Sequence, residues 1–211
     1  FGYAQESRWL GDVYKRQESI GHFIIQCEDG GFLQVGETYF FSNPISTKLY
    51  VVKTNIDGLK IWDNEIYIGG HNLGNSLLES TNGYLIFGGL DQNSSIIKLN
   101  KDNGAVIYNK SYDNGGTDAF ENGAEIPNGI VAVGYINSED PYNSFYTEGE
   151  GFISFLDNEA NEITSFSIGD YISQAYRIKY FNNELYISGL SLIHISEPTR
   201  LLSISYGVLG V

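Results

Sequence analysis

Few residues in this chain have side chains suited to chemistry. The single cysteine, Cys27, continues an apolar alternation with Phe23 and Ile25, which predicts a packed thiol in the core. The histidines His22 and His71 are far apart and have no neighbouring His or Cys, so their spacing predicts no zinc site. Solvent exposure or local hydrogen bonding accounts for both. We therefore expect no metal and no cofactor.

One short motif matches a catalytic signature in letters only. The segment Ser95-Ile-Ile-Lys98 spells the Ser-x-x-Lys of penicillin-binding enzymes. That motif needs a helix to bring its serine and lysine together, whereas these residues fall in a predicted strand. With no other catalytic set in view, the sequence predicts that the chain is not an enzyme.

Acidic turns offer oxygen atoms of the kind that calcium prefers. They recur at one place in each repeat, as 55–58, 100–104 and 157–161. None has a full twelve-residue loop with a terminal Glu, and Asn, Asp and Gly are also the residues that a tight hairpin requires. Structural turns are favoured, with calcium binding as the alternative.

A recurring phrase organises most of the chain. It ends in glycine in each copy, and a second phrase falls between the copies. The first phrase occupies 28–36, 80–88, 126–134 and 181–189, and the second occupies 49–58, 95–104 and 152–161. About three and a half copies of one unit are present.

Each unit is predicted to contain four short strands. In the clearest copy they span 74–79, 83–88, 94–99 and 105–110, and Asn-Gly and similar turns close the hairpins between them. Apolar pairs in the second strand are expected at equivalent alternate positions, so that one face of every repeat is buried against the next. These pairs are Leu33/Val35, Leu85/Phe87, Val131/Val133 and Leu185/Ile187.

The predicted fold class is all-β, a partial β-propeller of four-stranded antiparallel blades. Repeats of this length and strand content are typical of propeller blades. Residues 18–189 are the incomplete propeller. Because a blade is apolar on both faces, we expect the truncated fragment to self-associate through exposed blade edges.

The phrases resemble the Asp-Gly-Gly-Phe/Tyr repeats of exported β-propeller proteins from Bacteroidota-like bacteria. The second phrase resembles their Leu-Ile-Lys-Thr/Leu-Asn segment, which is followed by a glycine turn. The resemblance covers nearly all of 18–189 and specifies a blade, not a chemistry. It implies a secreted or cell-surface bacterial protein, and hence an extracellular location.

The two ends of the chain resemble translated sequencing-library adapter. Residues 7–17 match one reading frame of such an adapter, with a departure at Trp9, and residues 190–200 match the opposite strand. Segments of this kind are set apart from fold reasoning. Residues 1–17 and 190–211 are therefore expected to be tails that are not native and lack a packing role.

The charge of the chain excludes some classes of binding partner. The formal net charge is −14 at pH 7, with 26 acidic and 12 basic residues. A chain this acidic is repelled by phosphate backbones and anionic lipid. We expect no nucleic-acid partner and no membrane insertion.

Two connections, 37–48 and 135–150, are predicted to be enlarged loops on one face of the propeller. Long loops on a rigid scaffold are common places for binding. Their aromatic side chains are candidates for a platform that binds a glycan or protein ligand: Tyr39, Phe40, Phe41, Tyr142, Phe145 and Tyr146. Covering of the blade edges by these rings is the alternative. Acidic residues in 135–150 favour neutral or cationic partners.

The sequence thus predicts a non-enzymatic scaffold or recognition module. The alternative is a fragment of a propeller-fold glycosidase or polysaccharide lyase whose catalytic residues lie outside it or in the enlarged loops. Carboxylates or histidines that converge on the central channel would favour the enzyme.

Overall fold

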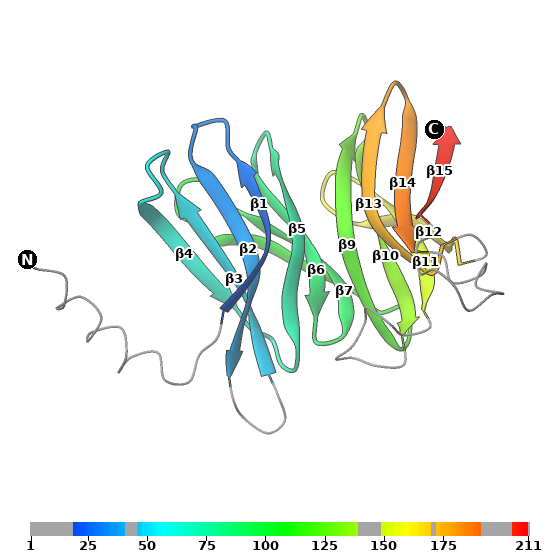
Figure 1. Cartoon of the computed structure of the whole chain (residues 1–211), viewed down its shortest axis with the longest axis horizontal. Coiled ribbons are helices and arrows are strands. Elements are labelled where there is room, and N and C mark those ends of the chain that lie inside the picture. The colour runs from blue at the N-terminus through cyan, green and yellow to red at the C-terminus, as the bar shows by residue number, and fades with distance from the viewer. Residues whose placement is uncertain (1–18, 41–45, 139–148, 170–171, 191–203, 211) are drawn as a thin grey trace, which may run out of the picture.

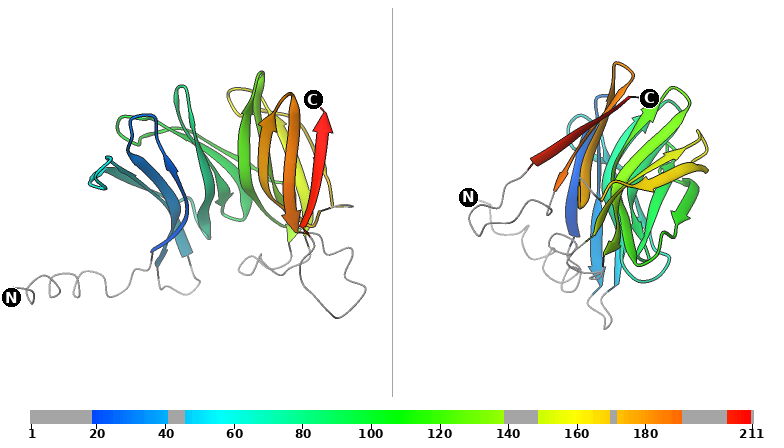
Figure 2. Two further views of the ribbon diagram at one scale, coloured as in Figure 1. Left: turned by 45° about the horizontal axis from the view of Figure 1, so that its top comes forward. Right: turned by 90° about the vertical axis from the view of Figure 1, so that its right-hand side faces the viewer.

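The strands form four antiparallel sheets that follow one another along the chain (Figures 1 and 2). The computed structural model describes residues 19–40, 46–138, 149–169, 172–190 and 204–210. These residues contain no helix, and hence none that is long and apolar enough to cross a membrane. The predicted all-β propeller architecture is confirmed.

Within each sheet the strands pair in sequence order. The first sheet contains β1 (Ser19–Gln26), β2 (Phe32–Phe40), β3 (Ser46–Thr54) and β4 (Lys60–Ile66). The second contains β5 (Asn72–Ser80), β6 (Gly83–Leu90), β7 (Asn93–Leu99) and β8 (Val106–Tyr112). The third contains β9 (Thr117–Ile126), β10 (Gly129–Ser138), β11 (Glu150–Leu156) and β12 (Glu162–Ser167). The fourth contains β13 (Gln174–Phe181), β14 (Glu184–Leu190) and β15 (Ile204–Gly210).

The first strand of each sheet lies beside the first strand of the next. Thus β1 neighbours β5, β5 neighbours β9, and β9 neighbours β13. This is the arrangement of innermost strands in propeller blades. We call the line around which these four strands gather the axis.

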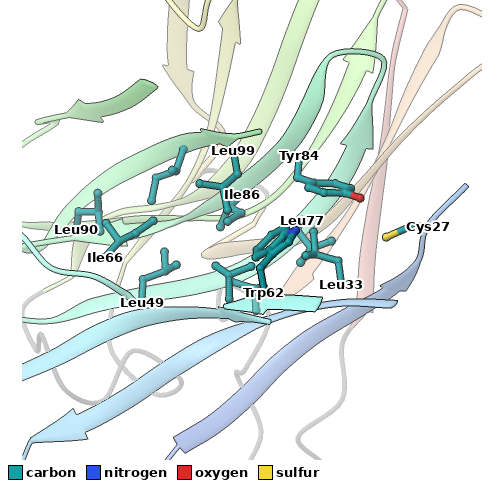
Figure 3. Close-up of a cluster of buried hydrophobic side chains, with 13 residues drawn as sticks. Cys27, Leu33, Leu49, Trp62, Ile66, Leu77, Tyr84, Ile86, Leu90 and Leu99 are labelled. Carbon is teal, nitrogen blue, oxygen red and sulfur yellow. The ribbon is translucent and has the colours of Figure 1, made fainter. Parts of the chain in front are cut away.

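Apolar side chains fill the space between successive sheets. Leu33 and Val35 of the first sheet pack with Tyr84 and Ile86 of the second in one cluster (Figure 3). Similar clusters join the second sheet to the third and the third to the fourth. Complete burial of one such side chain stabilises the folded state by about 1.5–3 kcal/mol. The blades therefore stabilise one another rather than standing alone.

The predicted apolar pairs are buried, with one correction of direction. Leu33/Val35, Leu85/Phe87 and Val131/Val133 face the following sheet, as expected. Leu185 and Ile187 are also buried, but they face the preceding sheet. They stand four and two residues before their glycine, whereas the other pairs stand three and one before theirs. A shift of one residue along a strand places the side chain on the opposite face of the sheet.

The acidic turns use their side chains to close the backbone. The Asn55 Oδ1 atom accepts the N–H groups of Asp57 and Leu59 at 3.0 and 2.8 Å. Asp157 Oδ1 accepts those of Glu159 and Asn161 at 2.9 and 2.8 Å. This is the local bonding that makes Asn and Asp favourable in turns.

The predicted tails lie mostly outside the described residues. Residues 1–17 are outside them, and so is 190–211 except for Leu190 and β15. The backbone of β15 pairs with β14, with Ile204 opposite Leu190. The adapter origin of both tails stays a prediction.

Hydrogen bonds of the buried residue Asn72, which we call the clasp, connect the first blade to the second. The Asn72 side-chain amide donates to the carbonyl oxygens of Thr47 and Gly69 at 2.8 and 2.7 Å, and the Asn72 N–H donates to Thr47 Oγ1 at 2.7 Å. Asn72 is fully buried. Asn72→Ala would leave the buried carbonyl oxygen of Thr47 and the half-buried one of Gly69 without this donor, and we expect it to lower the free energy of unfolding by about 1–3 kcal/mol.

Urea unfolding of the full chain measures this loss. The control is Asn109→Ala, which changes an exposed residue of β8. Equal unfolding midpoints for the two variants would show that the clasp contributes nothing.

Candidate functional site

Each innermost strand carries one residue that is left out of the ladder. In β1, Gly21 pairs with Gly36 and Phe23 pairs with Val35, so His22 has no partner. The same β-bulge recurs in β5, β9 and β13. A bulge turns a side chain away from its regular direction and often marks a functional site. The four bulged residues, which we call the axial set, are His22, Asn75, Glu121 and Tyr176.

The glycine that ends each repeated phrase lies opposite this bulge. A Cβ atom on Gly36 would lie 1.9 Å from the carbonyl oxygen of Ile20, and one on Gly134 would lie 1.9 Å from that of Ala119. The corresponding distances for Gly88 and Gly189 are 2.1 and 2.0 Å. Only glycine permits so close an approach of the two strands.

The axial set connects neighbouring blades. The Nδ1 atom of His22 lies 3.1 Å from the carbonyl oxygen of Gly74 in the second blade. The Asn75 side-chain amide donates to the carbonyl oxygen of Phe120 in the third, at 3.0 Å. One polar side chain from each of the first two blades is therefore held against the next innermost strand.

Glu37 bonds both histidines, His22 and His71, which are far apart in the sequence. Its Oε2 atom lies 2.9 Å from His71 Nε2, and its Oε1 atom lies 3.5 Å from His22 Nε2. The hydroxyl of Tyr39 donates to Oε1 at 2.8 Å. The Glu37 side chain is only 6% exposed. Burial alone would raise its pKa, but the bonds from His22, His71 and Tyr39 lower the pKa to about 2. Glu37 is therefore a fixed negative charge.

His22 is placed to carry a positive charge. Its ring nitrogens face the Gly74 carbonyl oxygen and the Glu37 carboxylate, and both of these groups only accept hydrogen bonds. The hydrogen bond with Glu37 raises the pKa of His22 above its ordinary value, against the opposing effect of burial. His22 and Glu37 thus form an ion pair at the axis.

Glu121 has a different environment from Glu37. Among the described residues its carboxyl group makes no hydrogen bond, and only the charges of Arg177 and His22 favour its ionised form. Burial outweighs them and raises the pKa of Glu121 to about 7. Two carboxyl groups near one histidine therefore differ in protonation, with Glu37 ionised and Glu121 able to exchange a proton near neutral pH.

Arg177 links the first and fourth blades across the axis. It follows Tyr176 in β13, and its guanidinium carbon lies 5.3 Å from the centre of the Phe23 ring in β1. Phe23 in turn follows His22. Residues of the first and fourth blades therefore contact each other beside the axial set.

The predicted aromatic platform is only partly within the described residues. Tyr39 is half-buried at the end of β2 and bonds Glu37, and Phe40 ends the same strand. Phe41, Tyr142, Phe145 and Tyr146 lie outside the described residues. The connection 37–48 is shorter than predicted, because β2 extends to Phe40 and β3 begins at Ser46.

Two other predicted features have clear outcomes. Ser95 and Lys98 lie three residues apart in β7, so their side chains point to opposite faces, and they form no catalytic pair. Cys27 is 4% exposed and belongs to the core, as predicted. Within the described ranges, no group of three or more His, Cys, Asp or Glu side chains is arranged to hold a metal ion.

The axial set was not predicted, although the sequence contains a signal for it. Each member stands thirteen or fourteen residues before the glycine that ends the phrase. The residues next to His22 and His71 in the sequence do not indicate that both histidines contact Glu37. His22 is exposed, as predicted, and His71 is half-buried, but their bonding is not local, since both bond Glu37, which is 15 and 34 residues away in the sequence.

The chain was compared with known proteins. No family model matches it, and no curated protein matches it. Among solved structures it is similar to a chimera of ACO and RPE65, with a TM-score of 0.51 and 12% identity over 92% of this chain and 50% of that chain. It is also similar to a mutant of Synechocystis apocarotenoid oxygenase (ACO), with a TM-score of 0.49 and 11% identity over 89% of this chain and 48% of that one. The chain spans about half the length of each.

The first likeness corrects one prediction. The sequence predicted that the chain is not an enzyme, and this prediction is corrected, because the fold that the chain shares with the ACO/RPE65 chimera is one on which an enzyme is built. At 12% identity the likeness shows the fold alone. The chemistry has to be argued from the residues on the axis.

Proposed function

We propose that this chain belongs to a β-propeller enzyme that cleaves a glycosidic bond at the axis, with Glu121 as the general acid. The observation that carries the proposal is the proximity of Glu121 to His22, which Glu37 bonds, while the Glu121 carboxyl group itself makes no hydrogen bond within the described residues. Glycosidases use a carboxylic acid to protonate the leaving-group oxygen. Glu121 is the one axial carboxyl group placed to do so.

Glu121 and water have separate roles in the proposed reaction. Glu121 donates its proton to the leaving-group oxygen as the glycosidic C–O bond breaks. Water supplies the hydroxyl group of the new reducing end, and its remaining proton restores Glu121 through solvent. Because Glu121 has a pKa of about 7, it holds this proton at mildly acidic pH and can release it near neutrality.

Glu37 serves as a positioning residue rather than as a nucleophile. His71 and Tyr39 bond its carboxylate, and its low exposure keeps substrate away. It fixes the orientation of His22, whose positive charge faces Glu121. That charge would stabilise the Glu121 carboxylate left after proton transfer.

A glycan suits the remaining groups on the axis. The Asn75 amide and the Tyr176 hydroxyl belong to the same axial set as Glu121, and the Phe23 ring follows His22 in β1. Sugars present hydroxyl groups to polar side chains and apolar ring faces to aromatic rings, so both kinds of contact are available.

The test incubates the full chain with neutral and acidic oligosaccharides. Hydrolysis is measured as the release of reducing ends. We expect Glu121→Gln to lower kcat about a hundredfold, because glutamine cannot donate the proton. The wild-type rate should fall as pH rises through about 7, and the residual rate of the variant should lack this decrease.

Glu125→Gln is the matched control, since Glu125 is exposed on the same strand as Glu121. It should keep the wild-type rate and pH profile. The proposal fails if none of the oligosaccharides is cleaved, or if Glu121→Gln cleaves them at the wild-type rate.

A further inference from the structure

The guanidinium of Arg177 lies at the axis, and most of its donors have no acceptor among the described residues. Its ring contact with Phe23 and a 2.7 Å bond from Nη1 to the carbonyl oxygen of Tyr176 fix its position. A guanidinium carries five N–H donors in a rigid fork. In the part of the chain that the structure describes, the fork makes one hydrogen bond to a protein acceptor, and Arg177 is exposed.

Arg177 differs from the lysines of the described part of the chain that pair with carboxylates. Lys53 pairs with Asp29 at 2.7 Å, and Lys101 pairs with Glu79 at 2.8 Å. Glu121 is near enough to Arg177 for their charges to interact, yet the two form no ion pair within 4.0 Å. In a chain of net charge −14, a guanidinium beside the axial set that has no carboxylate partner among the described residues is unusual.

We infer that Arg177 binds an anionic substituent of the glycan, so that the substrate is an acidic oligosaccharide bearing carboxylate or sulfate groups. The inference deepens the proposed function and rests on the same axial site. An arginine fork matches a carboxylate or sulfate through two parallel N–H···O bonds, and stacking on Phe23 orders the fork before the ligand arrives. Arg177 would place the anion one residue from Tyr176 and near Glu121.

This inference departs from the preference for neutral or cationic partners that the acidic residues of 135–150 suggested. Charges on an exposed rim act through solvent and are screened over about 8–10 Å at physiological salt. A bidentate bond in direct contact is screened much less. The contact at Arg177 therefore decides the class of ligand, while the net negative charge of the chain lowers the rate of encounter.

The test measures binding to the full chain by calorimetry with three probes: galacturonic acid oligosaccharides, sulfated galactose oligosaccharides and neutral galactose oligosaccharides. We expect at least one acidic probe to bind about tenfold more tightly than the neutral one. The acidic probe that binds more tightly identifies the anionic group.

Two variants locate the effect. Arg177→Gln should remove the preference for the acidic probe, and Arg177→Lys should restore only part of it, because lysine lacks the fork. Lys179→Gln is the matched control, since it removes one exposed positive charge from the same strand. It should keep the preference.

The outcomes separate this inference from the proposed function. Equal affinity for all three probes, or a preference that survives Arg177→Gln, overturns the inference even if neutral oligosaccharides are cleaved. A preference that depends on Arg177 without any cleavage supports the inference and removes only the proposed hydrolysis. Thermal unfolding of each variant confirms that it is folded.

Discussion

Replacing Gly36 with alanine is expected to lower the free energy of unfolding by about 3 kcal/mol or more. The new Cβ atom would meet the carbonyl oxygen of Ile20 at 1.9 Å, and this is backbone that no rotamer change can move aside. Relief requires β1 and β2 to separate where His22 bulges out of the ladder. Large losses of stability arise from backbone conflicts of this kind.

The control stands directly across the same ladder. Gly21 pairs with Gly36, yet a Cβ atom on Gly21 would meet nothing within 4 Å. Gly21→Ala should therefore be neutral or slightly stabilising, because alanine loses less backbone entropy on folding than glycine. Urea unfolding of both variants gives the comparison. Similar stabilities would contradict the view that the repeated glycine exists to accommodate the bulge.

The fold was predictable because its signals are local and repeated. Asn82-Gly83 marks a hairpin turn in the sequence, and the alternation of Leu85 and Phe87 assigns one face of the strand to the core. Both depend only on neighbouring residues. Leu185 and Ile187 show the limit of this approach, because a shift by one residue kept the apolar alternation but reversed the face.

The site was not predictable from such signals. His22, Glu37 and His71 come from three strands or connections, and their meeting depends on the register of β1 against β2 and on the packing of two blades. A bulge has no composition of its own. Glu37 was assigned to a loop, because the sequence alone does not show that β2 continues to Phe40.

Glu121→Gln is expected to raise stability at high pH and leave it unchanged at low pH. Burial raises the pKa of Glu121 from 4.5 to about 7 in the folded chain. Below about pH 4.5 the carboxyl group is protonated both folded and unfolded, so it has no effect on unfolding. As pH rises from 4.5 through 7, only the unfolded chain ionises freely, and the folded state loses stability by about 2–3 kcal/mol. Glutamine resembles the protonated acid and avoids this loss.

Thermal unfolding of the full chain at pH 4 and pH 8 checks this expectation. His22 also contributes stability that is present below its unfolded pKa and lost as pH rises through its raised folded pKa. Both proteins keep His22, so the difference between them reports mainly on Glu121. Glu125→Gln, on the exposed part of β9, should follow the wild type at both pH values. A Glu121→Gln variant that is less stable than the wild type at pH 8 would show that the carboxylate stabilises the fold. Glu121 would then lack the strained environment that suits a catalytic acid.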